Sequence, residues 1–102
     1  MAKYVFLYGG GTYPETEEEQ AQVMAAWSEW MGSAGDSLID GGAPIGQKKT
    51  IAPDGSVSDG GTVITGYSLY EAASMDDAMA FAMGCPHLGA GGTVEVGEAM
   101  TM

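Results

Sequence analysis

The stretch Lys3-Tyr4-Val5-Phe6-Leu7-Tyr8, followed at once by Gly9-Gly10-Gly11, decides how the rest of the chain can be arranged. Aromatic and β-branched residues dominate the first six positions and glycines end the run, which is the pattern of a β-strand entering a loop. Both faces of this strand are apolar, one with Tyr4, Phe6 and Tyr8 and the other with Val5 and Leu7. We therefore expect the strand to lie at the centre of a sheet, covered on both sides.

Two amphipathic helices are predicted downstream. The run Thr16-Glu17-Glu18-Glu19 fits a capping box, in which the Thr hydroxyl accepts a backbone N–H and the carboxylate three residues on accepts one in return. Apolar residues then recur at helical spacing before Gly32 or Gly35 ends the helix: Val23, Trp27, Trp30, Met31 and Ala34. Ser74-Met75-Asp76-Asp77 starts a second helix in the same way, and Gly84 and Pro86 end it.

Further strands complete the pattern. Residues 37–40 form a short extended piece, residues 62–70 an alternating strand and residues 93–98 a closing strand. Pro53-Asp54-Gly55, between two short polar segments, predicts an exposed hairpin. This order favours an α+β fold, a ferredoxin-like β-α-β-β-α-β sandwich with an extra β-hairpin, in a single domain spanning residues 1–102.

The two helices can cover only one face of that sheet. The apolar residues left on the other face would be exposed in a monomer, so we expect a homodimer that buries sheet against sheet. The eight Met residues are expected to fill gaps in the core and in the dimer face.

Composition removes several classes of partner. The chain has 102 residues with 3 Lys+Arg and 14 Asp+Glu, a formal net charge of -11, one Cys and one His. Nucleic acid and anionic membrane surfaces attract cations, so neither is expected as a partner. One Cys cannot form an internal disulfide, which favours a cytoplasmic location. No apolar run approaches the roughly 18 residues of a membrane span, and the apolar N-terminal stretch is too short for a signal peptide.

Seven stretches stand in an informative order and spacing: Lys3 to Gly10, Met24 to Trp27, Asp40-Gly41-Gly42, Asp59-Gly60, Gly66 to Tyr70, Cys85-Pro86-His87 and Gly92 to Val96. Together they resemble the YCII-related family, in its DGPF branch, over nearly the whole chain. The resemblance implies a ferredoxin-like subunit that assembles into a dimeric α+β barrel. The wider superfamily includes isomerases, lyases and monooxygenases, and some members of the family accompany extracytoplasmic-function sigma factors.

His87 and Asp40 are the candidate catalytic residues. Imidazole is the default acid or base near neutral pH, and His87 follows a helix stop, although it could instead cap that helix or bind a loop carbonyl. Asp40 ends a short strand, where it could orient the imidazole or form a turn with the two glycines after it. In several relatives that the resemblance points to, a His on the first helix is part of a His/Asp dyad. The first helix of this chain carries no His, so His87 and Asp40 are the residues that remain as a loose match to that dyad. Gly61-Thr62 also stands where the branch has Pro-Phe.

The ligand-binding candidates are Trp27, Trp30, Tyr8, Tyr67 and Asp59. The two Trp residues could line a cavity between helix and sheet or pack in the core, the Tyr residues could present hydroxyls there, and the Asp could serve a turn. Zinc needs three or four suitably spaced ligands, and neither a calcium loop nor a phosphate loop is present, so no metal and no cofactor are predicted.

Two functions of different class follow. The first is a small cytoplasmic homodimer that binds a small organic molecule, with cofactor-free acid/base chemistry of isomerase, lyase or hydrolase type if it is an enzyme. The alternative is a non-catalytic module that senses a ligand or binds a protein, of the kind the sigma-factor association implies. A pocket on which His87 and a carboxylate converge would favour catalysis.

Overall fold

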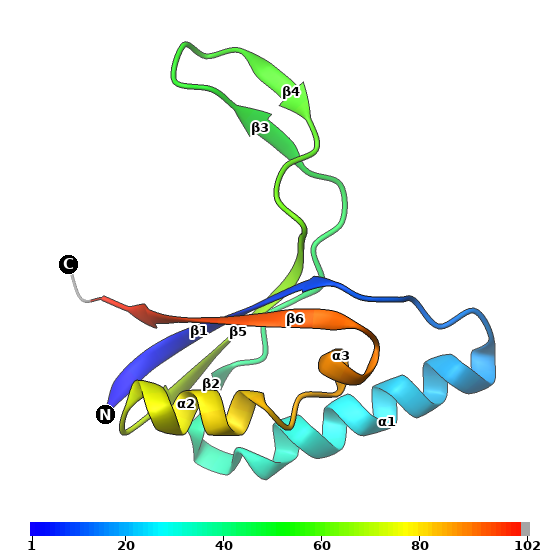
Figure 1. Ribbon diagram of the computed structural model, residues 1–102, viewed down its shortest axis with the longest axis vertical. Coiled ribbons are helices and arrows are strands. Elements are labelled where there is room, and N and C mark those ends of the chain that lie inside the picture. Colours follow the sequence, from blue (N-terminus) through cyan, green and yellow to red (C-terminus); the bar gives the residue numbers. More distant parts are fainter. Residues whose placement is uncertain (101–102) are drawn as a thin grey trace.

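The computed structural model describes residues 1–100, which adopt a mixed α+β fold (Figure 1). Its elements are β1 (Ala2–Gly10), α1 (Glu17–Ser33), η1 (Gly35–Ser37), β2 (Leu38–Asp40), β3 (Lys49–Ile51), β4 (Val57–Asp59), β5 (Ile64–Ala72), α2 (Met75–Ala82), α3 (Pro86–Gly89) and β6 (Gly92–Ala99). Four strands form an antiparallel sheet in the order β2-β5-β1-β6, and β3 and β4 form a separate hairpin. β1 has a neighbour on each side, so the prediction of a central strand is confirmed, but the helices cover only one of its two faces.

One face of the sheet carries all three α-helices (Figure 1). On this face Phe6 of β1 lies opposite Ser68 of β5, and both are fully buried. Trp30 of α1 stacks on Phe81 of α2 with ring centroids 4.6 Å apart, and its Nε1 donates to the Phe81 carbonyl at 3.1 Å. The ring of Phe6 lies 4.6 Å from that of Tyr70. An aromatic layer thus joins the sheet to both long helices.

The helices begin where the sequence predicts. The Thr16 hydroxyl accepts the Glu19 N–H at 3.1 Å, and the Ser74 hydroxyl accepts the Asp77 N–H at 3.1 Å. The first capping box differs in one bond, because the Glu19 carboxylate accepts the N–H of Glu15, at 3.0 Å, rather than that of Thr16. Glu19 therefore stabilises the start of α1 as the capping box predicts, although the N–H that it binds belongs to the residue before Thr16.

The hairpin arm, residues 49–59, rises from the face of the sheet opposite the helices (Figure 1). It is exposed, as its polar sequence predicts. Ile51 and Val57 lie directly opposite each other in the arm, and 72% and 60% of their surfaces are exposed. The arm therefore carries an apolar pair that the rest of residues 1–100 leaves uncovered.

The prediction that the Met residues fill the core is wrong for α2. Ala78 and Ala82 are the buried residues of this helix, which lets it pack closely on the sheet. Met75, Met79 and Met83 lie on its exposed side. The strand predicted over residues 62–70 is β5, shifted two residues toward the C-terminus, and Val63 before it is exposed.

Candidate functional site

The single His is held in a slot between backbone segments. His87 lies in α3, and its Nε2 is 2.8 Å from the Gly9 carbonyl oxygen at the end of β1. A Cβ added to Gly92 would lie 2.7 Å from Cε1 of the imidazole and nearer still to Nε2 and Cδ2, and one added to Gly11 would lie 2.8 Å from Cε1. Only glycine fits at either position, so the backbone of both segments lies close against the ring.

This contact also fixes where the ring proton lies. A carbonyl oxygen only accepts, so Nε2 of His87 donates to Gly9 and the neutral ring keeps Nδ1 as an acceptor. The ring packs beside two aromatic side chains, with its centroid 6.2 Å from that of Trp27 and 6.0 Å from that of Tyr8. The arrangement is that of an oriented imidazole whose Nδ1 has no hydrogen-bond partner within residues 1–100.

A pocket of about 420 Å³ opens beside this imidazole. The loop after β1, the first half of α1 and the α3 region line it: Thr12, Tyr13, Pro14, Glu19, Gln22, Val23, Ala26, Trp27, Pro86, His87, Gly89 and Ala90. The Thr12 N–H donates to the Ala90 carbonyl at 3.0 Å, which fastens the loop to the end of α3. We call this space the His87 pocket.

The polar lining residues that the sequence did not reveal as site residues include Glu19 and Gln22 of α1. In the sequence, helix capping alone explains Glu19, and Gln22 falls between the apolar positions of α1. Their spacing of three residues places both on one face of α1, with Val23 and Ala26. Their position on one face of α1 is the sequence feature that links these residues to the pocket. It can be recognised only once α3 is known to pack against α1.

The structure does not bring Asp40 to His87. Asp40 lies in β2, at the sheet edge opposite β6, and its Oδ1 accepts the Gly42 N–H at 2.8 Å. Gly42 has a φ of 72°, and a Cβ there would collide with the Tyr67 carbonyl, so this turn requires glycine. Asp40 therefore does not pair with His87. It forms a turn with the glycines that follow it, which is the alternative role that the sequence leaves open.

Asp59 also lies far from the pocket in the fold. It ends β4 in the hairpin arm, where Lys49 Nζ is 3.5 Å from its Oδ1. Both side chains are largely exposed, so the ion pair contributes little. The prediction that Asp59 helps to bind the ligand finds no contact that supports it.

The aromatic candidates divide between the pocket, the core and the open face of the sheet. Trp27 is half-buried and lines the His87 pocket, whereas Trp30 is buried among the core rings. The Tyr8 hydroxyl is hydrogen-bonded to that of Ser68, and burial raises the pKa of Tyr8 well above its usual range. Tyr67 lies on the sheet face away from the helices. Of the five ligand-binding candidates, only Trp27 meets the imidazole in a pocket.

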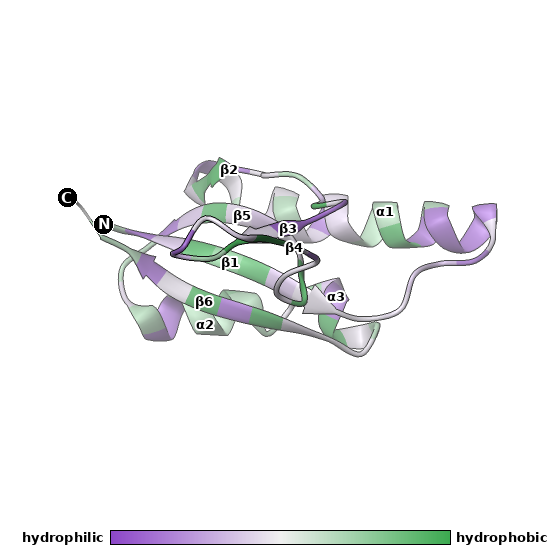
Figure 2. Cartoon of the chain, turned by 90° about the horizontal axis from the view of Figure 1, so that it is seen from above, coloured by the Kyte–Doolittle hydropathy of each residue, from purple (hydrophilic) through white to green (hydrophobic). Residues whose placement is uncertain are grey.

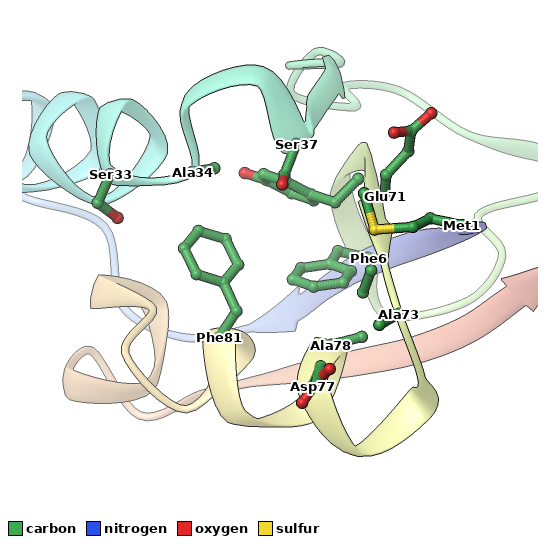
Figure 3. Close-up of a pocket in the computed structure, with 12 residues that line it drawn as sticks. Met1, Phe6, Ser33, Ala34, Ser37, Glu71, Ala73, Asp77, Ala78 and Phe81 are labelled. Atoms are coloured by element: carbon green, nitrogen blue, oxygen red, sulfur yellow. The ribbon is translucent and has the colours of Figure 1, made fainter.

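A second pocket, of about 350 Å³, lies at the other end of the helical layer (Figure 3). Phe6 and Phe81 point into it from the core, and the carboxylates of Glu71 and Asp77 stand at its rim. Tyr70 also lines it, and the buried Tyr70 hydroxyl has no hydrogen-bond partner among residues 1–100. This pocket contains no imidazole, so we assign the candidate site to the His87 pocket.

The remaining chemistry-bearing groups offer no further centre. Within residues 1–100, no three side chains of His, Cys, Asp or Glu gather as metal ligands would. Cys85 is 3% exposed, and burial raises its pKa to about 11, which keeps the thiol protonated and unreactive near neutral pH. None of the helices in this part of the chain has the length and apolar character needed to cross a membrane.

Comparison with known proteins adds no relative. No family model matches the sequence, and neither a curated protein nor a solved structure matches it. The assignment of function therefore depends on the sequence and on the geometry of the site.

Proposed function

We propose that the protein is a small-molecule-binding subunit of the YCII-related type and that its ligand occupies the His87 pocket. One observation carries the proposal: the chain's single imidazole, fixed by the Gly9 carbonyl, lines a cavity of about 420 Å³ together with Trp27. A cavity of this size with an apolar wall and a few placed polar groups is typical of sites for small ligands.

The strand order supports the proposed family. In a ferredoxin-like β-α-β-β-α-β unit the first strand lies between the third and the fourth, and each helix crosses over one sheet face. With the hairpin arm set aside, β2-β5-β1-β6 follows that order, and the helices lie on one face. The strand order and the position of the helices thus agree with the fold that the family resemblance implies.

Acid/base catalysis is the second candidate function. Glu19 and His87 both line the pocket, so a molecule bound there would contact a carboxylate and an imidazole. Nδ1 of His87 is the atom that would take or return a proton, and Glu19 would replace Asp40 as the carboxylate partner. Binding is the primary proposal because it needs only the cavity, whereas catalysis also needs the two groups to reach one reacting centre.

We also propose that the subunit forms a homodimer through its open sheet face. Apolar pairs stand side by side there, Val5 opposite Leu69 and Leu7 opposite Tyr67, and no helix covers them (Figure 2). The radius of gyration is 15.1 Å, against about 13 Å for a compact chain of this length, because the hairpin arm projects from the same face. A partner subunit would cover both. Light scattering should give twice the subunit mass, and a clean monomer would contradict this proposal.

Ligand-detected NMR with a library of small aromatic compounds tests the binding proposal. Ala26→Leu adds bulk inside the pocket, whereas Ala25→Leu adds the same bulk on an exposed neighbouring face of α1. Compounds that bind the unmodified protein should lose binding to the first variant and keep it with the second. Equal binding to both variants would place the ligands elsewhere and refute the proposal.

A further inference from the structure

The formal charge on the lining of the His87 pocket is negative. Glu19 is its only formally charged lining residue among those described, and its Oε2 accepts the Glu15 N–H. The chain has three Lys+Arg residues, and none of them lines the pocket. Lys48 Nζ donates to the Ile64 carbonyl at 2.6 Å, Lys49 pairs with Asp59, and Lys3 lies in β1 opposite Glu71. A carboxylate or phosphate ligand would find no fixed cation here.

The other lining groups favour a ligand that carries both a donor and an apolar body. His87 uses Nε2 to donate to the Gly9 carbonyl, so the neutral ring offers an acceptor at Nδ1. Trp27 is half-buried, and Tyr13 on the opposite loop is exposed. Aromatic faces attract cations as well as apolar groups. The pocket therefore combines a carboxylate, an acceptor nitrogen and aromatic surface.

The electrostatic field of the whole chain also disfavours an anionic ligand. The segment 41–70 contains Lys48, Lys49, Asp54 and Asp59 and is formally neutral, so the net charge of -11 resides in the rest of the chain. Glu17 and Glu18 neighbour Glu19 at the start of α1, which is the strongly hydrophilic end of that helix in Figure 2. Such a field raises the local concentration of cations and lowers that of anions.

We infer that the His87 pocket selects a small organic cation, an amine attached to an apolar or aromatic group, over the corresponding anion or alcohol. This inference rests on the proposed binding function and specifies the class of its ligand. Glu19 pairs with the ammonium group, Trp27 contacts the apolar body, and Nδ1 of His87 accepts an ammonium N–H. Screening by salt weakens the ion pair but leaves the apolar contact in place.

Three probes of similar shape test the inference: benzylamine, benzyl alcohol and benzoate, each titrated into the ¹⁵N-labelled protein at low and at high salt. Benzylamine should bind most tightly and benzoate most weakly, and added salt should weaken only the binding of benzylamine. Glu19→Gln should lower the benzylamine affinity about three- to tenfold and leave that of benzyl alcohol unchanged. Gln serves in a capping box as Glu does, so this variant should fold.

Glu18→Gln is the matched control, since it removes the same charge one residue away from the pocket lining. It should change the benzylamine affinity by less than about twofold, the effect of the long-range field alone. Equal affinities for amine and alcohol, a preference for benzoate, or equal effects of the two substitutions would each overturn the inference and leave ligand binding itself standing. Failure of all three probes to shift resonances of the pocket, together with a failed library screen, would overturn the proposed function as well. If Glu19→Gln fails to fold, the salt dependence of benzylamine binding to the unmodified protein tests the inference instead, and binding that added salt leaves unchanged would overturn it.

Discussion

Replacing Gly92 by Ala tests whether the glycine slot holds the imidazole. The new Cβ would lie within 2.7 Å of Cε1 of His87 and still closer to two other ring atoms, which real Cβ atoms do not tolerate. The His87 side chain would have to move out of the slot, where the backbone of Gly11 also lies close to the ring. The backbone at Gly92 has no positive φ, so Ala adds no backbone strain of its own.

The expected cost follows from the contacts that His87 would lose. Its hydrogen bond to the Gly9 carbonyl contributes about 1 kcal/mol, and its contacts with Trp27 and Tyr8 contribute about 1 to 2 kcal/mol together. Replacing Gly by Ala in a compatible strand position returns about 0.5 kcal/mol by restricting the unfolded chain. The free energy of unfolding should therefore fall by about 2 kcal/mol.

Urea unfolding followed by Trp fluorescence, at one protein concentration, measures this loss. With a slope of about 1 kcal/mol per molar urea, the midpoint should fall by roughly 2 M. Gly46→Ala is the control, since Gly46 has no positive φ and its Cβ would meet no atom within 4 Å, so this variant should not destabilise. In a His87→Ala background, Gly92→Ala should lose its effect because the clash is gone. Equal midpoints for the two Gly variants, or additive effects with His87→Ala, would refute the slot.

Three further predictions concern other parts of the chain. Cys85 should resist thiol reagents in the native protein near neutral pH and react fully in urea, since burial raises its pKa to about 11; stoichiometric labelling of the folded protein within minutes would contradict this. Thr16→Ala and Ser74→Ala should each lower the free energy of unfolding by about 1 kcal/mol by removing a helix cap, with Thr16→Ser near neutral; unchanged urea midpoints would argue against the caps. Ile51→Ser combined with Val57→Ser should shift sedimentation from dimer toward monomer if the hairpin arm contacts a partner, and an unaltered dimer would exclude that contact.

The elements of the fold were predictable because their signals are local. The alternation of β1, the caps at Thr16 and Ser74 and the turn at Asp54-Gly55 each need only a few neighbouring residues, and each element appears in the structure. The four-residue α3 was not predicted, since Pro86 reads as a helix stop and a single turn has no periodicity. It is α3 that carries His87 toward α1.

The candidate site was only partly predictable, because it depends on long-range order. His87 and Trp27 were singled out by residue type, and the structure brings them to one pocket. Asp40 was linked to His87 by resemblance, but strand order puts β2 and β6 at opposite edges of the sheet. Val23 belongs to the apolar stripe predicted for the first helix, but the first turns of α1 extend beyond the sheet, and there Val23 is exposed and lines the pocket.

The proposed site is tested most directly by mapping a bound amine onto the protein. Titration of the ¹⁵N-labelled chain with benzylamine should shift the indole N–H of Trp27 and the backbone amides of Gly89 and Ala90, and Ala26→Leu should abolish those shifts. Shifts that map instead to the second pocket, around Ala73 and Asp77, would contradict the account, as would shifts at the His87 pocket that survive Ala26→Leu.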